Sequence, residues 1–188
     1  MRIVVGITGA SGVVLGVRFL EVARKVAIET HTIVSPSAYE TMVLETDMKP
    51  EYVRALASRL YGYRDMAASI SSGSFMTDGM VVIPCSMKTL AGIAHGYDDN
   101  LIIRAAMVTL KERRRLVLVP RETPLNIMHI RNMLIVAKAG AVVLPAMPAF
   151  YPRPATVADI VDFLVGKVFD MFGVSHDLYK RWEGVNPE

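Results

Sequence analysis

The sequence predicts an α/β protein in which helices cover both faces of a parallel sheet, giving three layers in a single domain. Short runs of β-branched and apolar residues alternate with longer helix-like segments along the chain, which is the pattern of successive βαβ units. Two of the strand-to-helix junctions, at residues 8–12 and 84–89, carry polar turns. The 188 residues are enough for one such domain with a well-buried core.

The first βαβ unit begins with a strand over residues 3–7 and continues in a helix from Val13 to Val26. The turn between them favours glycine, because Gly9 and Gly12 can adopt positive φ and let a bound group approach the backbone closely. Free N–H groups at the start of the helix favour a phosphate or another anion. Because the spacing matches neither common nucleotide-binding glycine pattern, an ordinary turn without a ligand stays an alternative at this point.

The second strand is predicted over Glu29–Val34 and ends at Ser35, at the carboxyl edge where open parallel sheets bind ligands. Serine before a helix is equally a helix cap. Helices are predicted over residues 38–47 and 50–60, the second beginning with a proline. Residues 61–79 are rich in small and hydroxyl side chains, so they form either a flexible connection or a loop shaped for a ligand.

A third strand, Met80–Pro84, is apolar throughout and is therefore expected to be buried on both faces. It leads into Ser86-Met87-Lys88-Thr89, a second polar junction at the edge of the sheet where ligands bind. The alternative is structural, with Ser86 as a helix cap and Lys88 exposed to solvent.

Basic residues recur in the second half of the chain. The helix predicted over Leu101–Arg113 carries Arg104 and Lys111 close to one face, where they could reach an anion or stay solvated. A fourth strand, Leu116–Val119, ends in an Arg-Glu pair at residues 121–122, a position typical of functional side chains, although an ion pair that pins the loop is the alternative. Further elements are predicted as a helix over Asn126–Ala139, a strand over Ala141–Leu144, a helix that Thr156 caps and that runs to Phe172, and a C-terminal tail over residues 173–188.

The composition excludes several classes of protein. A scattered net charge of +3 argues against a nucleic-acid partner, and the single Cys85 cannot form a disulfide framework. No His, Cys or carboxylate spacing fits a metal site. Glycines interrupt the apolar N-terminal stretch and no apolar run is long enough to cross a membrane, so we expect a cytoplasmic protein. A hydrophobic content of 52% suggests that partner subunits cover some of the surface.

Seven short motifs identify a known family when they are taken together. Each motif alone is weak, but they follow the family order across nearly the whole chain. They are Gly-Ile-Thr-Gly-Ala-Ser-Gly at 6–12, Leu-Glu-Thr-Asp at 44–47, Ser-Ile-Ser-Ser-Gly-Ser-Phe at 69–75, Pro-Cys-Ser-Met-Lys-Thr at 84–89, Leu-Lys-Glu-Arg-Arg at 110–114, Val-Pro-Arg-Glu-Thr-Pro-Leu at 119–125 and Pro-Ala-Phe-Tyr at 148–151. On these motifs the chain resembles the UbiX family of flavin prenyltransferases.

The resemblance implies a Rossmann-like or flavodoxin-like homo-oligomer, typically a dodecamer with active sites between subunits. It implies that reduced FMN is the acceptor and dimethylallyl phosphate the donor, with no metal. The dimethylallyl group would be joined to N5 and then C6 of the flavin, with release of phosphate. The prenylated FMN would then serve a partner decarboxylase of the UbiD type.

The resemblance also assigns roles to individual residues. Catalytic roles fall to Ser11 with Glu45, which handle protons at the flavin, and to Lys111 and Glu122 at the prenyl phosphate. Breaking the C–O bond leaves charge on the phosphate, so cations and an acid there stabilise the leaving group. The residues implied to contact FMN are Gly9, Ala10, Ser11, Ser35, Ser86, Met87, Lys88, Thr89 and Arg121, and those implied to hold the donor are Arg104, Lys111, Glu122, Tyr151, Lys167 and Trp182.

Two positions depart from the family pattern, and two other functions stay open. Met107 stands where relatives commonly carry Asp, and Lys167 stands where many carry Arg, so affinity for the prenyl phosphate is expected to differ. One alternative is an FMN-dependent decarboxylase of the phosphopantothenoylcysteine type, whose members typically have Pro-Ala-Ser-Ala-Asn-Thr where this chain has residues 84–89. The other is a non-catalytic flavin carrier, which would need no proton-handling pair.

Overall fold

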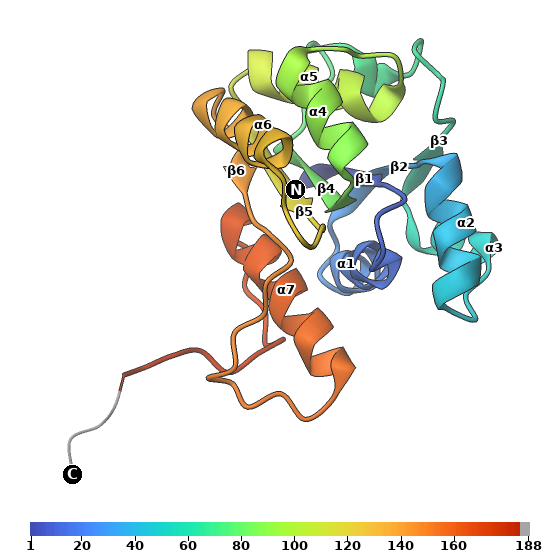
Figure 1. Ribbon diagram of the computed structural model, residues 1–188. Coiled ribbons are helices and arrows are strands. Elements are labelled where there is room, and N and C mark those ends of the chain that lie inside the picture. The colour runs from blue at the N-terminus through green and yellow to red at the C-terminus, as the bar shows by residue number, and fades with distance from the viewer. Residues whose placement is uncertain (185–188) are drawn as a thin grey trace. The chain divides into compact units, whose positions relative to one another are not determined.

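A six-stranded parallel sheet forms the centre of the fold, with the strand order β3-β2-β1-β4-β5-β6 (Figure 1). The direction of winding reverses between β1 and β4, which lie side by side. The carboxyl ends of these two strands therefore flank the crevice in which open α/β sheets bind their ligands. The strands are β1 (Arg2–Ile7), β2 (Glu29–Val34), β3 (Arg59–Tyr61), β4 (Gly79–Cys85), β5 (Arg115–Pro120) and β6 (Val142–Val143).

Residues 1–184 are described in the computed structural model, and they fall into two compact units, Met1–Ala146 and Met147–Glu188. The first unit holds the whole sheet with α1 (Val13–Lys25), α2 (Pro36–Glu45), α3 (Pro50–Leu56), the short 3-10 helix η1 (Ser69–Ser71), α4 (Met87–His95), α5 (Leu101–Lys111) and α6 (Ile127–Lys138). The second holds α7 (Val157–Phe172), which starts with the capping box of Thr156 and Asp159. Of residues 1–184, no helix is long and apolar enough to cross a membrane.

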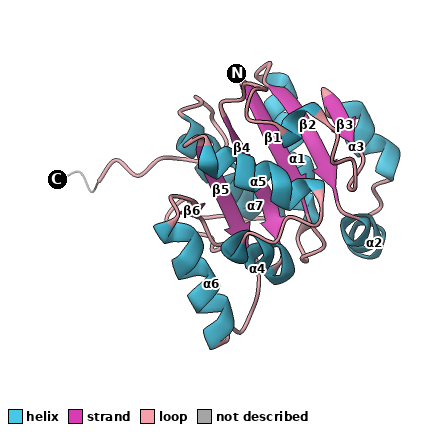
Figure 2. Cartoon of the chain, turned by 90° about the horizontal axis from the view of Figure 1, so that it is seen from above, coloured by secondary structure: helices cyan, strands magenta, loops and turns pink. Residues whose placement is uncertain are grey.

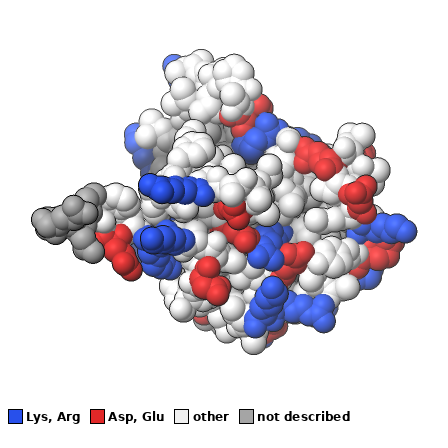
Figure 3. All heavy atoms as spheres, turned by 90° about the horizontal axis from the view of Figure 1, so that it is seen from below, with Lys and Arg blue, Asp and Glu red and all other residues white. Residues whose placement is uncertain are grey.

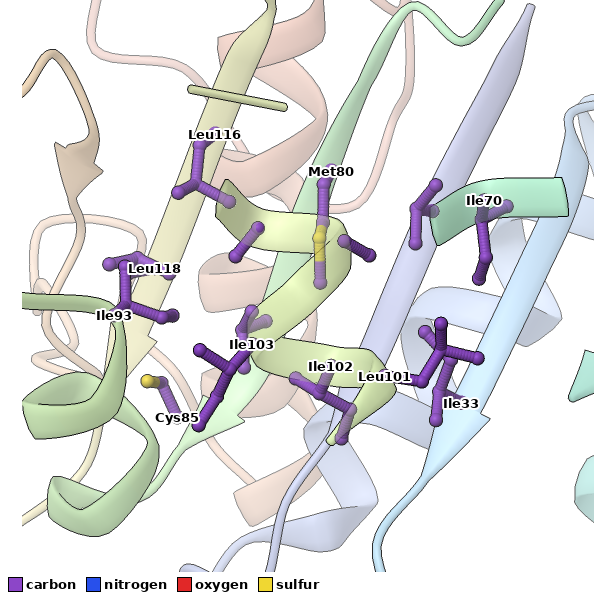
Figure 4. Packing of buried hydrophobic residues seen from close by; sticks show 14 of the residues in the cluster. Ile33, Ile70, Met80, Cys85, Ile93, Leu101, Ile102, Ile103, Leu116 and Leu118 are labelled. Carbon is purple, nitrogen blue, oxygen red and sulfur yellow. The ribbon is translucent and has the colours of Figure 1, made fainter. Parts of the chain in front are cut away.

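Helices cover both faces of the sheet, as the alternation of residues along each strand requires (Figures 1 and 2). Met80, Leu116 and Leu118 point from β4 and β5 toward Ile102 and Ile103 of α5 (Figure 4). The helix α1 lies on the opposite face (Figure 1). The predicted three-layer α/β fold is confirmed.

Gly16 is the residue that lets α1 pack closely on that opposite face. A Cβ atom at Gly16 would lie 2.5 Å from the carbonyl oxygen of Ile83 and 3.0 Å from the side chain of Ile7. Only glycine allows so close an approach of a helix to a strand. This contact fixes the start of α1, and with it the turn at residues 8–12, against the sheet.

One predicted element is wrong. The helix predicted over residues 50–60 ends at Leu56, and Arg59–Tyr61 form the edge strand β3 instead. A strand of three residues is too short to show a two-residue period in the sequence. Its conformation is set by parallel pairing with β2, in which His31 lies opposite Arg59 and Ile33 opposite Tyr61.

Charged side chains of both signs are interspersed on the face of the molecule shown in Figure 3. Basic and acidic residues are not gathered by sign there. A nucleic-acid backbone needs a continuous basic track to neutralise its phosphates. The mixed pattern gives no such track among the side chains visible in this view.

Candidate active site

Thr8 joins the two polar junctions at the reversal point of the sheet. Its buried hydroxyl donates to the carbonyl oxygen of Pro84 at 2.8 Å and accepts from the backbone N–H of Ser86, also at 2.8 Å. The turn after β1 and the turn after β4 are thus held together by one side chain. Thr8 could not be singled out from the sequence, because its partners lie far away along the chain.

We expect Thr8→Val to weaken this junction. The substitution keeps the shape of the side chain but leaves the Ser86 N–H without its partner, which costs about 1–3 kcal/mol of unfolding free energy. Urea denaturation measures that loss, and flavin titration measures the accompanying loss of FMN affinity. Thr8→Ser retains the hydroxyl and serves as the control; equal losses in both variants would contradict the role given to the hydroxyl.

The two glycines of the first turn have different structural roles. Gly12 has a φ of 96°, in the left-handed region, as the sequence led us to expect, whereas Gly9 does not lie in that region. A Cβ atom at Gly9 would lie 2.5 Å from the hydroxyl oxygen of Ser37, and Thr41 donates a hydrogen bond to the Gly9 carbonyl at 3.3 Å. Gly9 is therefore required by close packing of the turn on α2.

Ser11, Glu45 and Arg121 come together from three different elements. The Gly12 N–H donates to Glu45 Oε2 at 2.8 Å, and the Ser11 side chain lies close enough to the Glu45 carboxylate to lower its pKa. From the end of β5, Arg121 Nε donates to the carbonyl oxygen of Ser11 at 3.1 Å. The structure thus brings Ser11 and Glu45 together, and Arg121 contacts the Ser11 backbone.

The environment of Glu45 keeps its carboxylate ionised. Partial burial raises the pKa, but hydrogen bonds from Ser11 and from the backbone N–H groups of Gly12 and Val13, together with the charge of Arg121, outweigh burial and lower the pKa below its ordinary value. An ionised carboxylate that accepts from Ser11 can hold a proton passed through that hydroxyl. The pair is therefore suited to proton transfer at a ligand bound in front of it.

The two serines predicted to face a ligand also cap helices. Ser35 Oγ accepts from the Ala38 N–H at 3.1 Å, and Ser86 Oγ accepts from the Thr89 N–H at 3.3 Å. In the 86–89 segment only Lys88 is exposed, since Thr89 is buried and Met87 packs against the core. Ala10 is likewise buried, so it contributes shape to the turn but no polar group.

The donors at this edge suit a flavin mononucleotide. They are hydroxyls, free N–H groups at the start of α4, and the side chains of Lys88 and Arg121. A helix start beside a lysine binds phosphate, and the Ser11 hydroxyl can reach a heteroaromatic ring. Among residues 1–184, no group of three or more His, Cys, Asp or Glu side chains could hold a metal ion.

Arg104 and Lys111 both lie against the loop at residues 69–75. Arg104 Nε donates to the carbonyl oxygen of Ser71 at 3.1 Å, while its guanidinium pairs with Asp98 at 3.1 Å. Lys111 pairs with Glu112 and lies beside Gly73. Arg114 also donates to the carbonyl oxygens of Gly73 and Phe75, so this part of the 61–79 segment, left open between a flexible connection and a shaped loop, is ordered around three cations.

Lys111 lies at the opposite edge of the sheet from Ser11 and Glu45. It is the last residue of α5, just before β5 begins at Arg115, whereas Arg121 follows the carboxyl end of the same strand. Glu122, beside Arg121, is exposed and accepts from the Thr123 N–H at 3.0 Å. One chain thus places Ser11, Glu45, Arg121 and Glu122 at one edge and Lys111 at the other.

The remaining predicted residues belong to the second unit. The rings of Tyr151 and Trp182 meet edge to face, with their centroids 5.8 Å apart, and Tyr151 also contacts Phe163. Lys167 on α7 lies 3.5 Å from Asp170. A cavity of about 570 Å³ in this unit is lined by aromatic and basic side chains, among them Tyr151, Arg153, Lys180, Arg181 and Trp182.

The fold and the site at the reversal point define an α/β flavin-binding protein, and a family profile described as Flavoprotein matches residues 1–169. Flavin prenyltransferase UbiX of Escherichia coli K12 is 53% identical over 186 residues, covering 97% of this chain and 98% of that protein. The chain belongs to the UbiX family of flavin prenyltransferases.

Solved structures agree with this assignment. AnUbiX (PadA1), in complex with FMN and dimethylallyl pyrophosphate, has a TM-score of 0.96 at 51% identity, covering 98% of each chain. A dodecameric FMN-dependent UbiX-like decarboxylase from Escherichia coli O157:H7 also has a TM-score of 0.96, at 52% identity, covering 98% of this chain and 100% of that chain. An FMN-dependent cysteine decarboxylase, TvaF, shares only the fold, at 18% identity and a TM-score of 0.63.

Proposed function

We propose that this protein is a flavin prenyltransferase that transfers a dimethylallyl group from dimethylallyl phosphate to N5 and C6 of reduced FMN. The observation that carries the proposal is the contact of Ser11 with the ionised Glu45 at the reversal point of the sheet, held by Gly12 and Arg121. A protein that only stores a flavin has no use for a proton-handling pair at this position. Bound FMN supplies the nucleophilic ring atoms.

The chain's own residues bind and orient the two substrates. Lys88 and the start of α4 hold the FMN phosphate, and Arg121 fixes the turn that faces the ring. Ser11 and Glu45 accept the proton that leaves the ring during alkylation. The donor phosphate is bound by Arg104, Lys111, Tyr151 and Lys167, with Glu122 as the acid and Trp182 against the allyl group, where an aromatic face stabilises positive charge.

A shared site between subunits explains why Lys111 lies at the far edge of the sheet from Glu45. In a homo-oligomer such as a dodecamer, the Lys111 edge of one subunit completes the Glu45 edge of its neighbour. Exposed apolar residues on α6 support such packing, since Ile127, Met128 and Leu134 are each more than half exposed. The prenylated FMN is handed to a UbiD-type decarboxylase in the cytoplasm.

Mass spectrometry of the flavin tests the proposal directly. The purified protein is incubated anaerobically with reduced FMN and dimethylallyl phosphate, and the flavin is then released. A gain of one C5H8 unit is the expected result. Unmodified flavin despite tight FMN binding would exclude the transferase reaction and leave the cysteine-decarboxylase and carrier functions.

The Glu122→Gln variant distinguishes a catalytic flavin prenyltransferase from a non-catalytic flavin carrier. The exposed carboxyl can protonate the leaving phosphate, whereas the amide cannot, so we expect turnover to fall about 10²-fold or more with FMN affinity unchanged. Asp47→Asn, which removes an exposed carboxylate just beyond the C-terminus of α2, is the matched control. A Glu122→Gln variant that behaves as the parent in both measurements would favour the carrier.

A further inference from the structure

Asp170, near the end of α7, is the centre of the densest polar cluster in the second unit. Its carboxylate accepts from the Tyr179 hydroxyl at 2.5 Å, from Arg181 Nη2 at 2.7 Å and from His176 Nε2 at 3.1 Å. The fourth partner is Lys167 Nζ, one helical turn earlier, at 3.5 Å. Three partners thus belong to the C-terminal segment 176–182, and the fourth is the residue proposed to bind the donor phosphate.

The segment is held by directional contacts. His176 Nδ1 accepts from the Leu178 N–H at 3.3 Å, so in the neutral ring Nε2 carries the proton that is donated to Asp170. The His176 side chain is only 2% exposed. The ring of Tyr179 packs on Phe163 with a centroid distance of 4.9 Å. The segment is therefore docked on α7 by both packing and hydrogen bonds.

Gly166 makes this docking sterically possible. A Cβ atom at Gly166 would lie 2.7 Å from the ring of Tyr179 and 2.8 Å from that of His176. Both rings therefore occupy the space that a side chain at this position would fill. Glycine in the middle of a helix costs about 1 kcal/mol relative to alanine, so alanine here would favour the helix while blocking the docked segment.

The charges of the cluster do not balance. Asp170 carries one negative charge, and two cations, Arg181 and Lys167, lie beside it. Burial raises the pKa of Asp170, but the hydrogen bonds from Arg181, Tyr179 and His176 outweigh this and hold it at about 2. The short charge-assisted contact belongs to Arg181, whereas Lys167 is more distant and its side chain is 40% exposed.

We propose that Asp170 is a positioning residue that couples docking of segment 176–182 to the availability of Lys167. While the segment is docked, Arg181 pairs with one carboxylate oxygen at 2.7 Å, so Lys167, which pairs with the other oxygen at 3.5 Å, is held weakly and can turn to an anionic substrate. When the segment leaves, Lys167 is the remaining cation at Asp170 and is held more tightly. Docking also brings Trp182 against Tyr151. The anion is the prenyl phosphate, and in this respect the inference depends on the proposed function.

Three variants test the coupling. Arg181→Met frees Asp170, and Gly166→Ala displaces the segment without removing a charge. We expect either variant to raise the KM for dimethylallyl phosphate roughly tenfold and to lower kcat as well, because Trp182 leaves with the segment, while FMN affinity is much less affected. Adding Asp170→Asn to Arg181→Met removes the competitor for Lys167 and is expected to restore most of the donor affinity.

Trp182 reports docking independently of turnover, because it is the single tryptophan of the chain. Time-resolved fluorescence anisotropy should show fast local motion of the Trp182 ring in Gly166→Ala, in Arg181→Met and in the double variant with Asp170→Asn. The parent protein should show no such motion. Asp177→Asn, which removes an exposed carboxylate of the same segment, is the control for both measurements.

The outcomes separate the coupling from the proposed function. If the double variant binds the donor no better than Arg181→Met, or if Gly166→Ala leaves both KM and anisotropy unchanged, the coupling is overturned. If the parent transfers no prenyl group, the proposed function fails. Calorimetric titration with dimethylallyl phosphate then decides whether Asp170 still controls anion binding through Lys167.

Discussion

We expect Glu45→Gln to lower the rate of prenyl transfer about 10²–10⁴-fold while FMN stays bound. The amide oxygen still accepts from the Gly12 N–H, which lies 2.8 Å from the carboxylate, so the turn that faces the flavin keeps its geometry. What is lost is the ability to hold a proton delivered through Ser11. Single-turnover mass spectrometry of the flavin measures the rate, and flavin fluorescence measures FMN affinity.

The pH dependence gives a second test of Glu45. Its pKa is lowered in the folded protein, mainly because the hydrogen bonds from Ser11, Gly12 and Val13 outweigh partial burial. The carboxylate therefore stays ionised to a lower pH than an ordinary glutamate does. We expect the acid limb of the rate profile to lie below the ordinary pKa of glutamate; a limb near neutral pH would assign the titration to another group.

Glu40→Gln is the matched control for both measurements. Glu40 lies on the same helix, α2, and is exposed. Its substitution removes one carboxylate from the same element without touching the turn at residues 8–12. A loss of rate in Glu40→Gln as large as that in Glu45→Gln would show that the charge of α2, rather than the contact with Ser11, controls the reaction.

The sequence predicted the strands and helices whose signals are local. The cap at Thr156 and the apolar run of β4 each specify their element within a few residues, and both lie where they were predicted. The edge strand β3 has no such signal, because only backbone pairing with β2 makes Arg59–Tyr61 extended. Short edge strands are defined by their neighbours, which a single sequence does not reveal.

The residues of the candidate site likewise divide into those that local motifs reveal and those whose partners are known only from the fold. The polar junctions, and Ser11 with Glu45, could be named from motifs, and their contact follows in the structure. Thr8 and Asp170 were missed, because their roles depend on partners that only the folded chain brings near. For Asp170 a weak signal existed in the three-residue spacing from Lys167, which places the two side chains on one face of a helix.

A mixture of two inactive variants should regain activity if the site is shared between subunits. Glu45→Gln and Lys111→Met each remove one group required for transfer. Glu45 lies at the carboxyl edge of the sheet and Lys111 at the amino edge, separated by the six residues of β5, or about 20 Å. No lysine side chain spans that distance, so if both groups act on one substrate, as the proposed function requires, they come from different chains.

The size of the recovery can be estimated. After the oligomers are dissociated and reassembled from equal amounts of both variants, about a quarter of the sites combine an intact Glu45 with an intact Lys111 from its neighbour. Prenylated flavin formed per flavin bound measures this fraction. Each variant reassembled alone should remain inactive, which excludes reassembly itself as the source of activity.

Mixing Glu45→Gln with Ser11→Ala gives the decisive control. Ser11 and Glu45 contact each other within one chain, so every site in such a mixture carries one of the two defects and no recovery is expected. Recovery with Lys111→Met but not with Ser11→Ala assigns Lys111 to the neighbouring subunit's site. If neither mixture recovers, Lys111 acts within its own chain, and its position at the amino edge of the sheet then requires a second donor site there.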